Sequence, residues 1–254
     1  MTNMSDLQNK KFGVIIQARL SSSRLPGKVL KEVAGRPLIQ WQYLRLRQNL
    51  DSNVPVVIAT SEHESDDPLA DYCGERGMPV FRGSLNDVRQ RMIDAAIEQG
   101  ITHILRVGGD DPLIDSECVK ALIAAADEDE DDFIFASNRD GWPYGCAAEM
   151  IRRDSLELAK TISSDSLYTE HTIPIFFNFP DRFKVKRFES PPEIRRPDVL
   201  LSIDYVEDFK KVAAVIENFG ENTITATIPE ISAYLDAHPE IAEMNRHLHE
   251  GFDH

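Results

Sequence analysis

Short apolar runs alternate with amphipathic segments through the first half of the chain. The runs are rich in Val, Ile and Phe, which predicts strands buried in a sheet. They cover residues 12–16, 55–60, 79–81 and 103–107. Between them, apolar side chains recur at helical spacing at residues 38–49, 68–76 and 86–99. This alternation predicts an α/β fold, with a mostly parallel sheet and helices on both faces.

The second half of the chain follows the pattern less regularly. Further strands are predicted at 132–136 and 200–203, and further helices at 153–161 and through Phe209 and Val215. Clean periodicity is missing from much of 165–200, where we expect an inserted arm or hairpin. The tail, 228–254, is predicted to be helical and acidic. Since no repeat or low-complexity linker divides the chain, residues 1–254 are expected to form a single domain.

The loop after the first predicted strand is the most unusual segment. Residues 17–28 read Gln-Ala-Arg-Leu-Ser-Ser-Ser-Arg-Leu-Pro-Gly-Lys. Ligands of open parallel sheets bind outside the carboxyl ends of the strands, where this loop is expected to lie. Arg19, Arg24 and Lys28 supply positive charge, and the small residues let backbone N–H groups approach a phosphate. The pattern therefore predicts an anion site, although a solvated surface loop is the alternative.

Charge and composition limit the partners. The formal net charge is −15, which argues against a nucleic acid or an anionic membrane as partner, because both attract a basic surface. Three widely spaced cysteines fit a reducing compartment, and no apolar run reaches membrane-spanning length. With a polar start unlike a signal peptide, the chain is expected to be a cytoplasmic protein that captures a small anionic ligand. The oligomeric state stays open, with a homodimer as one possibility.

Two aspartates follow predicted strands and are candidate metal ligands. Asp110 ends the strand 103–107 with two glycines before it, and Asp204 follows the predicted strand 200–203. Mg²⁺ is usually held by one or two carboxylates together with substrate phosphates and waters. The alternative for Asp110 is a turn followed by a helix cap. Glu170 and His171 are either sugar contacts or a surface pair.

Several of these motifs together resemble a known family. Residues 16–30, which contain the basic loop, are similar to the opening signature of the acidic-sugar cytidylyltransferases, the CMP-Kdo and CMP-sialate synthetases. The segments 79–88, 109–115, 170–171 and 202–209 follow in the same order and most closely resemble the SpsF-like branch of spore coat polysaccharide biosynthesis. The resemblance spans roughly residues 12–215.

The resemblance implies a Rossmann-like nucleotide-diphosphosugar transferase fold and a set of site residues. Arg19, Arg24 and Lys28 would act on the triphosphate of CTP, and Asp110 and Asp204 would hold Mg²⁺. Further nucleotide contacts are expected from Gln17, Ala18, Ser22, Ser23, Gly83, Ser84, Asp87 and Gly109. Contacts to the acceptor are expected from Glu149, Glu170 and His171.

The function implied is transfer of CMP from CTP to an acidic sugar, with release of pyrophosphate, for surface polysaccharide or glycan biosynthesis. Ala147 stands where the branch commonly has an acidic residue, so the identity of the acceptor stays open. One alternative is a nucleotidyltransferase or GT-A-type glycosyltransferase that uses another nucleotide or a non-sugar acceptor. Another is a non-catalytic nucleotide-binding partner protein.

Overall fold

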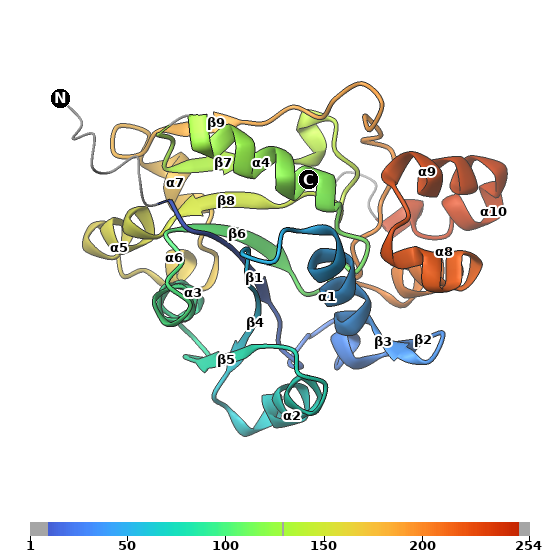
Figure 1. The fold of residues 1–254 in the computed structure, drawn as a ribbon, viewed down its shortest axis with the longest axis horizontal. Coiled ribbons are helices and arrows are strands. Elements are labelled where there is room, and N and C mark those ends of the chain that lie inside the picture. Colours follow the sequence, from blue (N-terminus) through green and yellow to red (C-terminus); the bar gives the residue numbers. More distant parts are fainter. Residues whose placement is uncertain (1–9, 129, 249–254) are drawn as a thin grey trace.

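The computed structural model describes residues 10–128 and 130–248, built around one seven-stranded sheet (Figure 1). Its strand order is β5-β4-β1-β6-β8-β7-β9. The strands are β1 (Phe12–Gln17), β4 (Val56–Ser61), β5 (Val80–Gly83), β6 (His103–Gly108), β7 (Phe133–Phe135), β8 (Glu149–Arg152) and β9 (Val185–Arg187). The short strands β2 (Glu32–Val33) and β3 (Arg36–Pro37) form a separate pair.

The helices and the strands alternate along the first half, as the sequence predicted. The helices are α1 (Leu38–Asn49), α2 (Asp67–Glu75), α3 (Val88–Glu98), α4 (Ser116–Glu128), α5 (Arg153–Ile162), α6 (Ser166–Glu170), α7 (Pro174–Asn178), α8 (Val206–Phe219), α9 (Ile228–Ala237) and α10 (Pro239–Ala242). Short 3₁₀ turns include η1 (Lys28–Leu30), η2 (Glu64–Asp66) and η4 (Gly220–Ile224). Within the described residues, none of the helices is long and apolar enough to cross a bilayer.

The sheet is mostly parallel, which confirms the predicted fold class. Strands β5, β4, β1 and β6 run parallel to one another, whereas β8 runs antiparallel to both β6 and β7. Successive side chains of β1 point to opposite faces: Val14 and Ile16 pack in one core cluster and Ile15 in another. All three are fully buried, because helices cover both faces.

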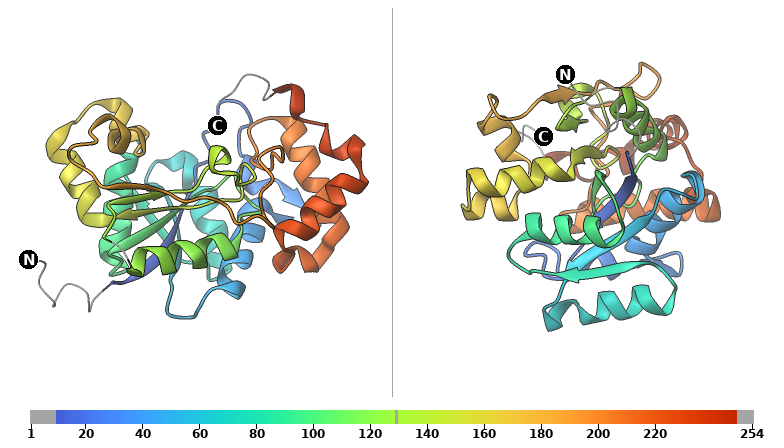
Figure 2. Two further views of the ribbon diagram at one scale, coloured as in Figure 1. Left: turned by 90° about the horizontal axis from the view of Figure 1, so that it is seen from above. Right: turned by 60° about the vertical axis from the view of Figure 1, so that its left-hand side comes forward.

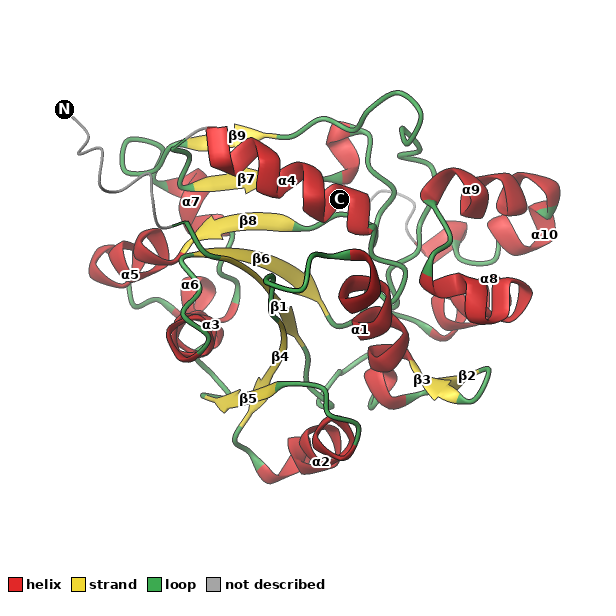
Figure 3. Ribbon diagram, in the orientation of Figure 1, coloured by secondary structure: helices red, strands yellow, loops and turns green. Residues whose placement is uncertain are grey.

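Each face of the sheet has its own set of helices (Figure 2). Side chains of α1, α2 and α4 pack on one face, and those of α3, α5 and α7 pack on the other. A third core cluster joins α8 and α9 to α1. The helices α8, α9 and α10 gather beside α1 at one side of the molecule (Figure 3). The parallel strands thus lie between two helical layers, with their carboxyl ends left for loops.

Two elements differ from the sequence-based predictions. The prediction of a strand at 200–203 is wrong: apart from an isolated bridge between Leu200 and Tyr144, this segment belongs to no strand. Its backbone is held by single hydrogen bonds instead, such as the one that Ile203 N donates to Asp110 O (3.0 Å). Strand β8 was not predicted, because Glu149 and Arg152 make two of its four residues charged.

The segment 165–200 contributes to the main sheet and its core. Strand β9 pairs with β7 in parallel, and Phe176 of α7 is fully buried against Phe133. These contacts differ from the inserted arm or hairpin that the irregular sequence suggested. The predicted helical tail begins with α9 and α10, and its last part, 249–254, lies outside the described residues.

A buried arginine ties α1 to two loops. Arg45 is 3% exposed, and its Nε donates to Ile114 O (3.1 Å) and its Nη2 to Ala226 O (3.0 Å). Its Nη1 donates to Thr223 O in η4. Burial lowers the pKa of Arg45, but each nitrogen of its guanidinium has a carbonyl acceptor. The side chain therefore fastens the turn before α4 and the connection between α8 and α9 to the central helix.

We expect Arg45→Met to lower the free energy of unfolding by roughly 3 kcal/mol or more, because it leaves three buried carbonyls without a donor. Urea denaturation of the purified protein measures this loss. Arg47→Met on the same helix is the control, since the hydrogen bond of Arg47 to Asp51 O lies at the surface. Equal stability of the two variants would contradict a fastening role for Arg45.

Candidate active site at the carboxyl ends of the parallel strands

The loops after β1 and β6 meet around a cavity of about 370 Å³. Gln17 and Gly108 are paired across the two strands, and Gly109 N donates to Gln17 O (2.9 Å). A Cβ on Gly109 would lie 2.7 Å from the Cβ of Ala18, so only a glycine lets the loops approach this closely. The cavity therefore forms where two neighbouring parallel strands end.

Most of the predicted site residues line this cavity. They are Gln17, Ala18, Arg19, Ser22, Ser23, Arg24, Lys28, Gly109, Asp110, His171 and Asp204. Among the described residues, Gly83, Ser84, Asp87, Glu149 and Glu170 do not line it. Glu170 lies at its rim, where Oε1 pairs with Arg19 Nη2 at 3.2 Å, and both side chains are exposed.

Lys28 joins the two candidate metal ligands. Its Nζ lies 2.8 Å from Asp110 Oδ2 and 3.1 Å from Asp204 Oδ1, and its side chain is buried. The residue before it, Gly27, adopts φ +68°, which turns the chain so that Lys28 can begin the 3₁₀ turn η1. Burial disfavours the ammonium, but the two carboxylates outweigh this effect and raise the pKa of Lys28.

Arg24 adds a second cation to Asp204. Its Nη2 lies 2.8 Å from Asp204 Oδ1, and its guanidinium lies 5.3 Å from the centre of the Tyr205 ring. Partial burial opposes the charge, but Asp204 and Tyr205 raise the pKa of Arg24. Half of this side chain is exposed, so it can turn toward an anion in the cavity without unfolding its loop.

Asp110 and Asp204 are near each other although their segments are far apart in the sequence, because one ammonium contacts both. Two carboxylates with room for phosphate oxygens suit Mg²⁺, which rarely takes an all-protein cage. Asp111 follows directly after Asp110 and is partly buried, and desolvation together with the charge of Asp110 raises the pKa of Asp111 well above the usual range. A third carboxyl thus lies beside the pair of candidate metal ligands.

A second cavity of about 280 Å³ shares Arg106, Gly108 and Asp110 with the first. Glu149 lines it and accepts from Arg106 Nη1 at 3.0 Å; burial raises the pKa of Glu149 although Arg106 opposes this. Arg106 Nε also donates to Gln17 Oε1 (3.3 Å). The guanidinium of Arg106 thus stands in the wall between the two cavities.

Asp66, which the sequence analysis missed, holds the basic loop in place. It is fully buried, and its Oδ1 accepts from Leu20 N at 2.7 Å. Its Oδ2 accepts from the backbone N–H (3.3 Å) and the hydroxyl of Ser61, at the end of β4. One carboxylate therefore pins the basic loop to the neighbouring strand. No signal in the polar segment 61–67 distinguished Asp66 from its acidic neighbours.

A network from the C-terminal helices supports Asp204 from behind. Asp208 Oδ2 accepts from Asp204 N (2.9 Å) and Tyr205 N (2.7 Å), which caps α8. Its Oδ1 accepts from Asn245 Nδ2 at 2.8 Å, and Asn245 Oδ1 in turn accepts from Lys211 Nζ at 3.0 Å. All three side chains are buried, and burial lowers the pKa of Lys211 to about 8.

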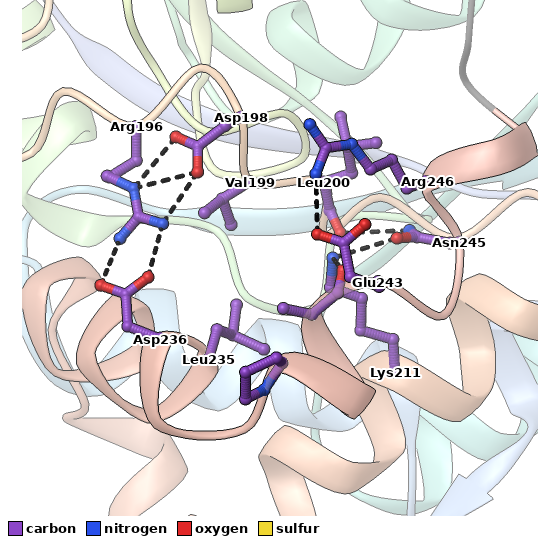
Figure 4. A pocket seen from close by; sticks show the side chains of 12 residues that line it. Arg196, Asp198, Val199, Leu200, Lys211, Leu235, Asp236, Glu243, Asn245 and Arg246 are labelled. Atoms are coloured by element: carbon purple, nitrogen blue, oxygen red, sulfur yellow. Dashed lines mark hydrogen bonds and ion pairs between the residues drawn. The ribbon is translucent and has the colours of Figure 1, made fainter.

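Lys211 and Asn245 line a further cavity, of about 230 Å³, between the segment 196–200 and the helices α8 to α10 (Figure 4). Arg196 bridges Asp198 and Asp236 at the other side of this cavity, and Arg246 pairs with Glu243. These ionic partners are within the cavity wall itself. The cavity therefore lies at the contact between the helices. The hydrogen bonds from Lys211 through Asn245 and Asp208 connect its wall to the backbone of Asp204.

Comparison with known proteins gives one consistent family. The cytidylyltransferase family model matches residues 13–236. The chain is 31% identical over 232 residues to the spore coat polysaccharide biosynthesis protein SpsF of Bacillus subtilis, covering 90% of this chain and 95% of that protein. It is similar to the structure of a cytidylyltransferase from Leptospira borgpetersenii, with a TM-score of 0.84, 27% identity and coverage of 92% and 97%.

A more distant structure shares the fold. A CMP:2-keto-3-deoxy-manno-octonic acid synthetase, solved in complex with CTP, has a TM-score of 0.60 and 19% identity, and the match covers 82% of this chain and 99% of that one.

We expect Asn245→Ala to lower the free energy of unfolding by about 2–4 kcal/mol, because it removes hydrogen bonds from buried Lys211 and Asp208 together. Thermal unfolding measures the change. Asp236→Asn, in the wall of the same cavity, is the control: its carboxylate is exposed, and surface ion pairs contribute little. A loss no larger than that of the control would show that the network does not hold α8 to the C-terminal segment.

Proposed function

This chain belongs to the cytidylyltransferase family, and from that premise we propose that it transfers CMP from CTP to an acidic sugar and releases pyrophosphate. The single observation that best supports this proposal is the first cavity. Arg19, Arg24 and Lys28 line it together with the carboxylates of Asp110 and Asp204. A triphosphate with a divalent cation requires this combination of charges.

The proposed reaction is attack by an acceptor hydroxyl oxygen on the α-phosphorus, in line with the bond to the departing pyrophosphate. Arg19 and Arg24 neutralise charge that develops on the phosphate oxygens, while Lys28 can exchange a carboxylate for a phosphate. Most of the catalytic work is then positioning of the two reactants. Asp110 and Asp204 would hold Mg²⁺, which would supply further charge neutralisation at the phosphates.

The second cavity suits the acceptor, because it opens beside the first and shares Asp110 with it. Arg106 in the dividing wall is a donor within reach of either side, and it suits the carboxylate of an acidic sugar. Glu149 would then orient Arg106 and accept from sugar hydroxyls. His171 lines the first cavity, and Glu170 lies at its rim. We therefore propose that these two residues contact the sugar of the nucleotide and do not bind the acceptor.

The name of the Bacillus subtilis relative supports a place in polysaccharide biosynthesis. A curated 3-deoxy-manno-octulosonate cytidylyltransferase of Saccharophagus degradans, 34% identical over 116 residues, supports an ulosonic acid as acceptor class. That match covers 44% of each chain. The three cysteines are buried and free, which suits the proposed cytoplasmic setting.

We expect pyrophosphate release from CTP in the presence of Mg²⁺ and an ulosonic acid, and much less from ATP, GTP or UTP. Arg24→Ala should lower kcat/KM for CTP roughly ten- to a hundredfold, since one charge-assisted contact contributes about 1.5–3 kcal/mol. Arg24→Lys should recover part of this, because lysine lacks the two-donor fork.

Lys31→Ala is the matched control, since its Nζ lies against the ring of Phe209, outside the cavity. Preference for another nucleotide would favour the alternative of a nucleotidyltransferase or GT-A-type glycosyltransferase that uses that nucleotide. Binding of CTP with no turnover on any acidic sugar would favour the non-catalytic partner.

A further inference from the structure

Arg91 is a buried cation in the wall of the first cavity that the sequence analysis did not single out. It lies on α3, is fully buried, and lines the cavity with Arg19, Arg24 and Lys28. Its Nη1 donates to Ser84 O at 2.7 Å. Among the described residues, its Nε and Nη2 have no hydrogen-bond partner. A complete edge of the guanidinium is therefore unused.

An unused edge on a buried guanidinium is costly. Removing a cation from water destabilises the folded protein unless the cation is paired and hydrogen-bonded. Burial lowers the pKa of Arg91, and the nearby charge of Arg19 lowers it further, against weaker opposition from Asp66 and Asp87. Arg45 is also buried, but each nitrogen of its guanidinium has a carbonyl acceptor. A ligand that accepts hydrogen bonds from Nε and Nη2 would remove this cost at Arg91.

The local backbone is arranged around this side chain. A Cβ on Gly83 would lie 3.1 Å from Cγ of Arg91 and 2.9 Å from the Phe81 ring, so the glycine makes room for the arginine. The carbonyl of Ser84 fixes the guanidinium plane, and Asp87 caps α3 by accepting from Gln90 N at 2.7 Å. Gly83 and Ser84, for which nucleotide contacts were expected, thus lie against Arg91, which lines the cavity.

We propose that the Nε–Nη2 edge of Arg91 binds the donor nucleotide through two adjacent acceptor atoms, which places Arg91 among the substrate-binding residues. This proposal rests on the proposed function. The edge presents two parallel N–H groups, which match a pair of phosphate oxygens or the O2 and N3 atoms of cytosine. Uracil carries a hydrogen on N3, so the second match would also select cytosine.

Arg91 is fully buried, so a ligand reaches it only when a neighbouring side chain moves. Arg19 lies near enough to oppose the charge of Arg91, and it is held toward Glu170 by an exposed ion pair. Exposed ion pairs contribute little to stability, so an arriving anion can draw Arg19 away from Glu170. The like charges of Arg19 and Arg91 would then both be neutralised by the ligand.

The test is Arg91→Met, compared with Arg89→Met on the same helix. Arg89 is also buried, but its Nη1 and Nη2 donate to Ala159 O and Ser163 O, away from the cavity. We expect Arg91→Met to keep or raise the melting temperature of the nucleotide-free protein, while its Kd for CTP rises at least tenfold, about 1.4 kcal/mol. Arg89→Met should lower the melting temperature and leave the Kd unchanged.

Calorimetric titrations with CTP, UTP and inorganic tripolyphosphate separate the two sources of acceptors. If Arg91 binds phosphate, Arg91→Met loses affinity for tripolyphosphate as well as for CTP. If it binds the base, affinity for tripolyphosphate is kept and the preference for CTP over UTP falls.

Two results overturn the proposal. In one, Arg91→Met binds CTP as tightly as the unaltered protein; in the other, it unfolds or melts lower without nucleotide, as a purely structural arginine would. Failure of the unaltered protein to bind CTP would instead contradict the proposed function itself, and the proposal for Arg91 with it.

Discussion

The contact of one ammonium with two carboxylates is the interaction on which the site depends. Lys28 Nζ meets Asp110 Oδ2 and Asp204 Oδ1, and these residues come from the loop after β1, the loop after β6 and the segment before α8. Two carboxylates that face one cavity repel each other unless a cation lies between them. Lys28 provides that cation from within the chain, so the separate segments converge on one point.

Each part of the fold helps to keep this contact in place. The parallel pairing of β1 with β6 brings their loops together, and Gly109 lets the loops touch. Asp66 pins the basic loop to β4 from one side. From the other side, Asp208 holds the backbone of Asp204, supported by Asn245. The C-terminal helices therefore matter for the site although they do not belong to the sheet.

Much of the site could be predicted because it follows a simple geometric rule. Basic and acidic side chains that follow buried parallel strands meet at one edge of the sheet. The rule predicted the positions of Lys28 and Asp110 correctly, because each follows a short apolar run that is easily recognised as a buried strand. Asp204 was expected at the end of a strand, which is wrong because residues 200–203 form no strand. The hydrogen bond from Ile203 N to Asp110 O nevertheless holds the segment before Asp204 against the loop after β6.

The features that the sequence analysis missed depend on the burial of charged side chains, which a single sequence does not reveal. Arg91 looks like an ordinary surface position of an amphipathic helix, and Asp66 like one of several acids in a turn. Strand β8 can begin with the charged Glu149 because Glu149 meets Arg106 across the sheet, a pairing between residues far apart in the chain. In each case a charged side chain is buried by a partner or a cavity that only the folded structure supplies.

Binding of Mn²⁺, a spectroscopic substitute for Mg²⁺, tests the central contact most directly. Electron paramagnetic resonance can compare the unaltered protein with Lys28→Met in the absence of nucleotide. If Lys28 occupies the place of a metal between two carboxylates, Lys28→Met should bind Mn²⁺ at least about tenfold more tightly, because repulsion by the ammonium is gone. Adding Asp110→Asn should cancel the gain. Equal or weaker Mn²⁺ binding by Lys28→Met would contradict the account.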